Sequence, residues 1–258
     1  MDLTSTLGGD EPCRYKIMDE SLTSAIRTRY QRALGQIAEA ASRSGRDPGK
    51  VRLVVVTKSQ PLEIVRAAVA AGASLLGENY AEEAVEKISA LQNSAVEWHM
   101  IGHVQSRKAD QVAANFSMLH SLDSLKLAGR LERFCAELGR TLPVLLEVNV
   151  SGEESKYGFA AWDERAWPDL VPALAPLTEF PHLRVRGLMT MPPYFDDPER
   201  TRPYFRRLRR LLEFLTAHLP EADWSELSMG TSADFVAAVE EGATFVRVGQ
   251  AILGPRPG

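Results

Sequence analysis

A lysine closes the first strongly apolar segment of the chain and is the leading candidate for covalent chemistry. Val51 to Thr57 is a β-branched run, and Lys58 follows it directly. The alternation of a strand places Lys58 on the same side as Val54 and Val56, which we expect to face inward. An ammonium there is either paired or loses its proton, and a neutral amine attacks carbonyl carbons. The plainer alternative is a lysine that reaches water from a strand end.

A hydroxyl-rich turn near the carboxyl end is the second candidate. Ser228 to Asp234 reads Ser-Met-Gly-Thr-Ser-Ala-Asp, at the expected junction of a strand and a helix. Two serines, a glycine and the free N–H groups of a helix start can cradle an anion, and phosphate is the natural ligand. Helix capping explains the serines and Asp234 taken singly. Arg247 and Gly249 on the next strand favour the phosphate interpretation.

An amine that forms a Schiff base opposite a phosphate cradle suits two chemistries. A class I aldolase would act on a phosphorylated sugar and would need further acid and base groups, for which Glu147 and Asn149 on one strand face are available. A pyridoxal phosphate site needs a partner for the pyridine nitrogen. An arginine such as Arg247 would leave that nitrogen unprotonated and weaken the ring as an electron sink. The residues alone leave both possibilities open.

The elements that would position these residues alternate along the chain. Leu22 to about Ala41 repeats apolar residues at helical spacing. Eight strand-like segments follow, each except the last clearly succeeded by a helix. Their expected ranges are 51–57, 74–78, 97–102, 118–122, 143–150, 184–191, 224–229 and 245–252.

Strands that alternate with helices imply parallel pairing, because parallel neighbours need long crossovers. Eight such units predict a (β/α)8 TIM barrel, an α/β fold, with an extra N-terminal helix. An open doubly wound sheet is the rival, but no Gly-x-Gly-x-x-Gly turn follows any strand. No linker divides the chain, so we expect a single domain over 21–258 and a disordered tail over 1–20. In a barrel of this kind the site lies at the carboxyl ends of the strands.

Composition limits the possible partners and location. The 258 residues carry 30 basic and 34 acidic side chains, a net charge of −4, which does not favour nucleic acid. No apolar run is long enough to span a membrane, and none resembles a signal peptide. Two cysteines, Cys13 and Cys135, do not make a disulfide scaffold. We expect a cytoplasmic protein and, without a long exposed apolar stripe, a monomer.

A pair of histidines invites a metal interpretation. His99 and His103 have the four-residue spacing of a metal-binding helix. On a strand, four residues span roughly 13 Å, too far to share one ion. We therefore expect two polar groups near the barrel mouth and no metal.

Seven segments, in order, resemble the motifs of the pyridoxal phosphate homeostasis proteins. Their order and spacing match over roughly residues 21 to 254, which makes the resemblance far more specific than any single motif. They read VVVTKSQP around Lys58, then GENY at 77–80, WHMIG at 98–102, SKYGF at 155–159, RGLMTM at 186–191, the turn at 228–234, and RVG at 247–249.

The resemblance implies a fold-type III barrel similar to the N-terminal domain of alanine racemase. Pyridoxal 5'-phosphate would be held as an internal aldimine on Lys58, with Asn79 near its ring and Arg247 near the cofactor. Members are regarded as carriers or regulators of vitamin B6 supply and amino-acid homeostasis, without established catalytic activity, and apo-enzymes are candidate recipients. The implied phosphate contacts come from Ser228, Gly230, Ser232 and Gly249.

One segment departs from the family pattern, and one argument separates a carrier from an enzyme. The family's usual Gln-x-Asn-Lys is Gln105-Ser106-Arg107-Lys108 here, which replaces a short amide by a long cation. Racemisation, the alternative function, needs a proton acceptor and a proton donor on opposite faces of an amino-acid adduct. Lys58 supplies one. The second, in alanine racemase, is a tyrosine of another domain, and we find no candidate for it in this sequence.

Overall fold

Eight parallel strands close into a ring, which confirms the predicted TIM barrel. The computed structural model describes residues 11–92 and 94–256, with side chains from Glu20 onward. β9 pairs with β1, and β4 pairs with β5, so the sheet has no open edge within the ring. The ring strands are β1 (Arg52–Val56), β2 (Leu75–Glu78), β3 (Glu97–Met100), β4 (Met118–Leu122), β5 (Leu142–Asn149), β7 (Leu183–Met189), β8 (Glu226–Ser228) and β9 (Phe245–Val248).

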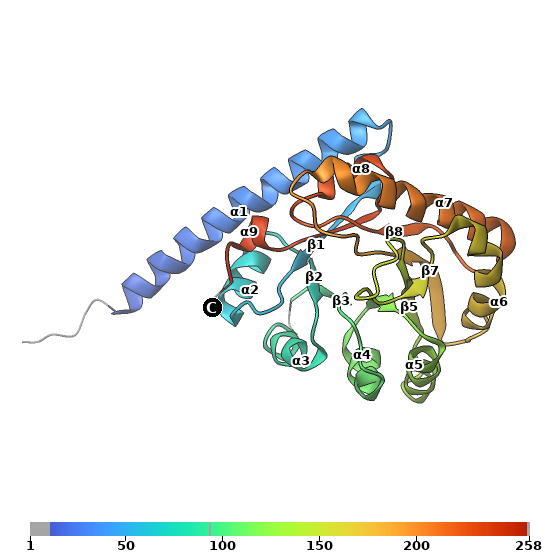
Figure 1. The fold of residues 1–258 in the computed structure, drawn as a ribbon. Coiled ribbons are helices and arrows are strands. Elements are labelled where there is room, and N and C mark those ends of the chain that lie inside the picture. The colour runs from blue at the N-terminus through green and yellow to red at the C-terminus, as the bar shows by residue number, and fades with distance from the viewer. Residues whose placement is uncertain (1–10, 93, 257–258) are drawn as a thin grey trace, which may run out of the picture.

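Helices follow the strands and surround the ring, as Figure 1 shows. They are α2 (Leu62–Ala70), α3 (Ala81–Ala90), α4 (Ala109–Asn115), α5 (Leu125–Glu137), α6 (Trp167–Thr178), α7 (Arg202–His218), α8 (Phe235–Glu240) and α9 (Gln250–Leu253). Short 3-10 turns add η1 (Pro48–Lys50), η2 (Ser106–Lys108), η3 (Glu164–Ala166) and η4 (Pro198–Thr201).

The strands differ most from the sequence prediction in two details. The last strand was expected to run to Ile252, but it ends at Val248, because Gly249 leaves the extended region with φ −114° and ψ −80° and α9 begins at the next residue. A two-residue strand, β6 (Phe159–Ala160), was not predicted and pairs with the carboxyl end of β5. Two residues are too few to show a periodic pattern.

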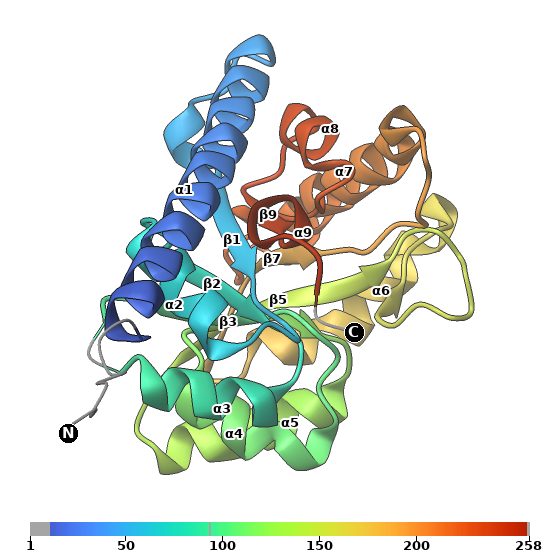
Figure 2. The same cartoon turned by 90° about the vertical axis from the view of Figure 1, so that its left-hand side faces the viewer.

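The N-terminal helix is longer than expected. α1 runs Glu11–Arg43, so the part of the predicted tail from Glu11 onward is helical, while residues 1–10 lie outside the described residues. Pro12 stands in its first turn, where proline is favoured, and neither proline nor glycine follows before Gly35. α1 packs on α2, α8 and α9, and its N-terminal turns extend past the barrel in Figure 1 and toward the viewer in Figure 2.

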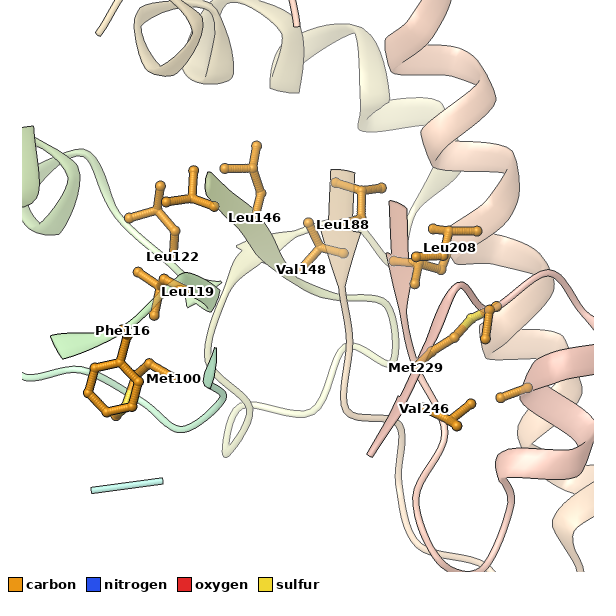
Figure 3. Packing of buried hydrophobic residues seen from close by; sticks show 14 of the residues in the cluster. Met100, Phe116, Leu119, Leu122, Leu146, Val148, Leu188, Leu208, Met229 and Val246 are labelled. Atoms are coloured by element: carbon orange, nitrogen blue, oxygen red, sulfur yellow. The ribbon is translucent and has the colours of Figure 1, made fainter. Parts of the chain in front are cut away.

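Alternation along each strand builds two apolar cores. Outward side chains pack between the ring and its helices, and Figure 3 shows part of this layer, including Phe116, Leu146 and Leu188. Inward side chains form a smaller cluster inside the ring, made of Val54, Ile101, Met118, Leu145, Met189 and Phe245. Cys135 is fully buried in the outer core, as predicted, whereas the side chain of Cys13 lies outside the described residues. In the described ranges, no helix combines the length and the apolarity that a membrane crossing demands.

Candidate functional site

A cavity of about 510 Å³ opens where the strands end, within the usual size range of small-molecule sites. It brings together five of the seven predicted site residues, Lys58, Asn79, Ser232, Arg247 and Gly249. The rest of its wall is Val56, Ile101, Met191, Tyr194, Thr231, Ala233, Gln250, Ala251 and Arg256. Closure of the ring places the ends of β1 and β9 side by side, so residues far apart in sequence meet here.

Lys58 follows β1 and is half-buried in the cavity wall. Burial lowers the pKa of its ammonium, the positive charge of Arg256 lowers it further, and the carboxylate of Glu78 acts in the opposite direction. A larger fraction of the Lys58 amine is therefore neutral than in an exposed lysine. A neutral amine is what attack on a carbonyl carbon requires.

A buried ion-pair network holds the backbone on both sides of Lys58. The Lys87 ammonium donates to the Thr57 carbonyl at 2.8 Å, to Glu78 at 2.8 Å and to Glu83 at 2.5 Å. The same Glu83 oxygen accepts from the Ser59 backbone N–H at 2.7 Å. Ser59 has φ +55°, a conformation that a serine adopts at a cost. The network thus fixes the turn that aims Lys58.

Arg247, an inward residue of β9, is a buried cation on the cavity wall. Its guanidinium donates to the Ser228 hydroxyl at 2.5 Å, to the Thr190 carbonyl at 3.0 Å and to the Met191 sulfur at 2.8 Å. Burial lowers its pKa to about 10, with Asp234 and Glu147 opposing that shift, so the group stays charged at neutral pH. The cavity wall therefore carries a fixed positive charge.

The turn after β8 has its hydroxyls on the cavity. Asp234 accepts from the backbone N–H of Thr231 at 2.7 Å and from its hydroxyl at 3.0 Å, which closes the turn. The Ser232 hydroxyl oxygen accepts two long bonds, from the N–H groups of Gly249 at 3.3 Å and Ala251 at 3.5 Å. Such lengths lie at or beyond the usual limit, so a stronger acceptor could replace the serine oxygen at both donors.

Ser228 and Gly230 are not in the cavity wall. The Ser228 side chain is fully buried, and its hydroxyl is engaged by Arg247 and His120. Gly230 has φ +90°, and a Cβ there would lie 2.5 Å from the Cβ of Ala238 and 2.9 Å from the Cα of Phe235. The glycine therefore allows the turn to pack closely on α8. The direct phosphate contacts of these two residues stay predictions.

A second cavity of about 470 Å³ adjoins the first, with Asn79, Ile101 and Met191 common to both walls. Arg107, the departure from the family pattern, lines it and donates to Gln105 at 2.9 Å. Glu147 lies in the same wall, and burial, aided by Asp123, raises the pKa of its carboxyl to about 7. Glu147, the acid or base group on β5 that the aldolase alternative would use, therefore lines the second cavity and not the first.

The two histidines occupy different places. His103 lies at the mouth, as expected, and its ring contacts Asp123 at 2.8 Å. His99 was expected there too, but it is buried inside the ring, because it is an inward residue of β3 and not its last one; it lies 2.9 Å from His120. Among the described side chains, no three His, Cys, Asp or Glu residues gather in the manner of a metal site.

Several residues of the site were not predicted from the sequence. Lys87 and Glu83 have the four-residue spacing of a helical ion pair, a signal that was available but common. His120, Tyr194 and Arg256 carry no local signal, because their relation to the site arises from closure of the ring and from loop paths.

The match to known proteins covers most of the chain. Residues 33–257 match the alanine racemase N-terminal domain, so the protein belongs to that family of barrel proteins. Within it, the chain belongs with the pyridoxal phosphate homeostasis proteins. It is 42% identical to the one from Pseudomonas aeruginosa over 90% of this chain and 96% of that one. It is 38% identical to the one from Aquifex aeolicus over 88% of this chain and 97% of that one.

Solved structures support the same placement. PipY of Synechococcus elongatus, whose structure was determined with PLP bound, is 35% identical, with a TM-score of 0.74 over 84% of this chain and 100% of that one. Alanine racemase from Corynebacterium glutamicum is 20% identical, with a TM-score of 0.63 over 89% of this chain and 61% of that one. At that identity the likeness concerns the fold alone.

Proposed function

We propose that this protein binds pyridoxal 5'-phosphate and carries or buffers it, and so maintains vitamin B6 and amino-acid homeostasis. The observation that carries the proposal is a single cavity with a lysine amine on one part of its wall and, on another, the hydroxyl-bearing turn after β8 beside the Arg247 cation of β9. The homeostasis proteins to which the chain is similar, and PipY with PLP bound, support the same ligand.

Lys58 supplies the reversible attachment. Its neutral Nζ attacks the aldehyde carbon of the ligand, a C=N bond replaces the C=O bond, and the carbonyl oxygen leaves as water. The lowered pKa of the lysine increases the fraction of neutral amine. The Lys87 network holds the turn at Ser59, so the amine starts from a fixed direction.

The opposite wall fits an anion and a heteroaromatic ring. Ser232 and the N–H groups of Gly249 and Ala251 would hold the phosphate, with the charges of Arg247 and Arg256 nearby. The buried Oδ1 of Asn79 has no hydrogen-bond partner among the described residues, although it borders the cavity. A bound ligand with a donor would supply the missing partner, which supports the fit.

Delivery and assembly belong to the same proposal. We infer that the protein acts as a cytoplasmic monomer and that apo-enzymes are its recipients. A reversible bond to Lys58 favours a carrier, because hydrolysis or exchange releases the ligand intact. Light scattering tests the oligomeric state: the expected mass is that of one chain, 28.5 kDa, and twice that mass would contradict it.

The decisive experiment is mass spectrometry of the intact protein after incubation with pyridoxal phosphate, before and after borohydride reduction. Reduction should fix one ligand to the wild-type chain and to Lys126→Ala, a matched change at an exposed lysine of α5. Lys58→Ala should show no added mass and no visible absorption band. Retention of both by Lys58→Ala would place the attachment elsewhere, and trapping by a sugar phosphate instead would favour the aldolase alternative.

A pyridoxal phosphate-dependent racemase is the second candidate, because the structure reveals a tyrosine in the cavity wall. Tyr194 lines the cavity on the loop after β7, whereas Lys58 lies after β1. Incubation with amino acids in deuterated water separates the two functions. Many turnovers of α-hydrogen exchange, lost in Tyr194→Phe, would establish the enzyme; no exchange supports the carrier.

A further inference from the structure

A continuous row of hydrogen bonds runs through the barrel interior and ends at the cavity. Nδ1 of His99 lies 2.9 Å from Nε2 of His120, and Nδ1 of His120 lies 2.8 Å from the Ser228 hydroxyl. The Ser228 oxygen accepts from Arg247 at 2.5 Å. Four inward residues, from β3, β4, β8 and β9, are thus linked from the middle of the ring to its mouth. We call them the interior chain.

The donor and acceptor roles in the interior chain can be assigned. Arg247 can only donate, so Ser228 accepts from it, and the serine hydroxyl proton needs an acceptor of its own. Nδ1 of His120 is that acceptor if the proton of this ring is on Nε2, and Nε2–H then donates to Nδ1 of His99. In the opposite tautomer, the Ser228 proton would have no partner inside a fully buried site. One direction, from Ser228 toward His99, gives a partner to the Ser228 hydroxyl proton, to both nitrogens of His120 and to Nδ1 of His99.

The surroundings keep both imidazoles neutral. Burial lowers the pKa of His99 to about 3, and burial with neighbouring positive charge holds the pKa of His120 well below its usual range. Two cations lie near the two histidines, Arg247 and Arg52. The guanidinium carbon of Arg52 lies 3.7 Å from the centre of the Phe245 ring. The carboxylate of Glu97 is 3.9 Å from Nε2 of His99. A neutral ring has one donor and one acceptor nitrogen, as the chain requires.

We propose that His120, supported by His99, is a positioning residue for the cofactor site: it fixes the Ser228 hydroxyl as a donor away from Arg247 and thereby aims the guanidinium at the ligand. The inference rests on the proposed function. Three guanidinium N–H groups are bonded to Ser228, Thr190 and Met191 within the described residues. Of the five that arginine carries, two are not used by these bonds, and Arg247 lines the cavity, so we expect these two to be available to a ligand.

The first test uses the unmodified protein without ligand. Nitrogen-15 NMR of the imidazole rings reports the tautomer and charge of each histidine. We expect His120 and His99 to be neutral from pH 5 to 8 with their protons on Nε2. A proton on Nδ1 of His120 would overturn the proposal, because Ser228 would then accept two bonds and have no defined donor direction.

The second test compares ligand binding in three variants. His120→Asn places an amide oxygen where Nδ1 accepts from Ser228, whereas His120→Phe fills the space without an acceptor. Phe116→Leu, a change of a fully buried residue outside the interior chain, is the control for lost stability. The dissociation constant for pyridoxal phosphate should rise about tenfold or more in His120→Phe and less than threefold in His120→Asn and Phe116→Leu.

A second readout separates positioning from general destabilisation. The pH midpoint of the visible absorption band should shift in His120→Phe and remain at the wild-type value in His120→Asn and Phe116→Leu. Equal affinity losses in His120→Phe and Phe116→Leu, with no shift of the midpoint, would overturn the proposal. If wild-type protein fails to bind pyridoxal phosphate, the proposed function fails, while the NMR result still decides whether the interior chain has the assigned direction.

Discussion

At the scale of single residues, the site depends on how burial changes ionisable groups. Burial lowers the pKa of the Lys58 ammonium and raises that of the Glu147 carboxyl, while Arg247 stays charged despite being buried. Burial therefore favours a neutral amine at Lys58 and a partly protonated carboxyl at Glu147, while Arg247 keeps its positive charge. Two substitutions that remove a charge, at Arg256 and at Glu147, test this effect.

Arg256→Gln should make Lys58 more basic. The positive charge of Arg256 lowers the lysine pKa, so its removal raises that pKa and reduces the neutral amine at pH 7. We expect condensation with pyridoxal phosphate to slow by about two- to threefold, with a smaller difference at high salt, because Arg256 is exposed and screened. Stopped-flow absorbance measures the rate.

The control for that change is Arg184→Gln, which removes the same charge at an exposed position near the start of β7. Its rate should equal that of the wild type. If Arg256→Gln has the wild-type rate at every pH and salt concentration, Arg256 does not tune the amine.

Glu147→Gln should remove a pH dependence of stability. The carboxyl has a pKa of about 7 when folded and about 4.3 when unfolded, so between these values only the folded state holds the proton. The free energy of unfolding of the wild type therefore falls as pH rises from about 4.3 to 7 and is level above that range. The difference is about 4 kcal/mol as an upper bound.

Urea unfolding of wild type and Glu147→Gln at pH 5 and 8 measures this effect. The wild type should lose stability relative to the variant between the two pH values. A constant difference between the two proteins across this range would show that Glu147 titrates normally.

At the scale of elements, β1, β2 and α3 are joined next to the candidate lysine, Lys58, by one largely buried network. Glu78 is fully buried and its pKa is raised by burial, although Lys87 and Thr57 bond to it and oppose that shift. The network also holds the strained Ser59 turn. Losing one partner should therefore affect both the stability of the barrel and the aim of Lys58.

Lys87→Met should destabilise the protein by about 3–5 kcal/mol, because it leaves a buried carboxylate without its cation. The double variant Lys87→Met with Glu78→Gln removes both charges and should recover part of the loss. Chemical denaturation of the single and double variants gives the coupling energy. A loss below about 1 kcal/mol in the single variant would mean that water or another group replaces the lysine.

At the scale of the whole molecule, closure of the ring and the packing of α1 make one body. α1 contacts α2, α8 and α9, and just beyond its end Arg46 donates to the carbonyls of Val239 at 2.6 Å and Ala243 at 2.8 Å. The N-terminal helix is thus tied to the last βα units of the barrel. We propose on this basis that residues 21–258 unfold as a single domain.

Ile37→Ala tests whether α1 and the barrel unfold together. Ile37 is buried against the barrel, so its truncation should cost about 2–5 kcal/mol and lower the stability of the whole protein. Circular dichroism and tryptophan fluorescence should report one shared transition in urea. Loss of helix signal at a lower urea concentration than the fluorescence change would show that α1 unfolds separately.

Local patterns of the sequence predicted much of the fold and part of the candidate site. The β-branched run before Lys58, the alternation of strands and helices, the turn at 228–234 and the segment after it predicted the ring and four of the residues now found around one cavity, and the family resemblance added Asn79. Such patterns are readable because neighbours in sequence determine which face of a strand is buried and where a helix begins. They also placed the candidate lysine at the correct end of its strand.

The tertiary structure alone decided which distant side chains support that lysine and its opposite wall. His120 and Ser228 are 108 positions apart, and Arg43 lies 197 positions from Glu240, which it contacts at 2.7 Å. Neither contact has a sequence signal, because each exists only once parallel strands have closed into a ring and the first helix has packed against the last. Local order is encoded residue by residue, whereas the interior chain and the Lys87 network depend on the register and closure of the barrel.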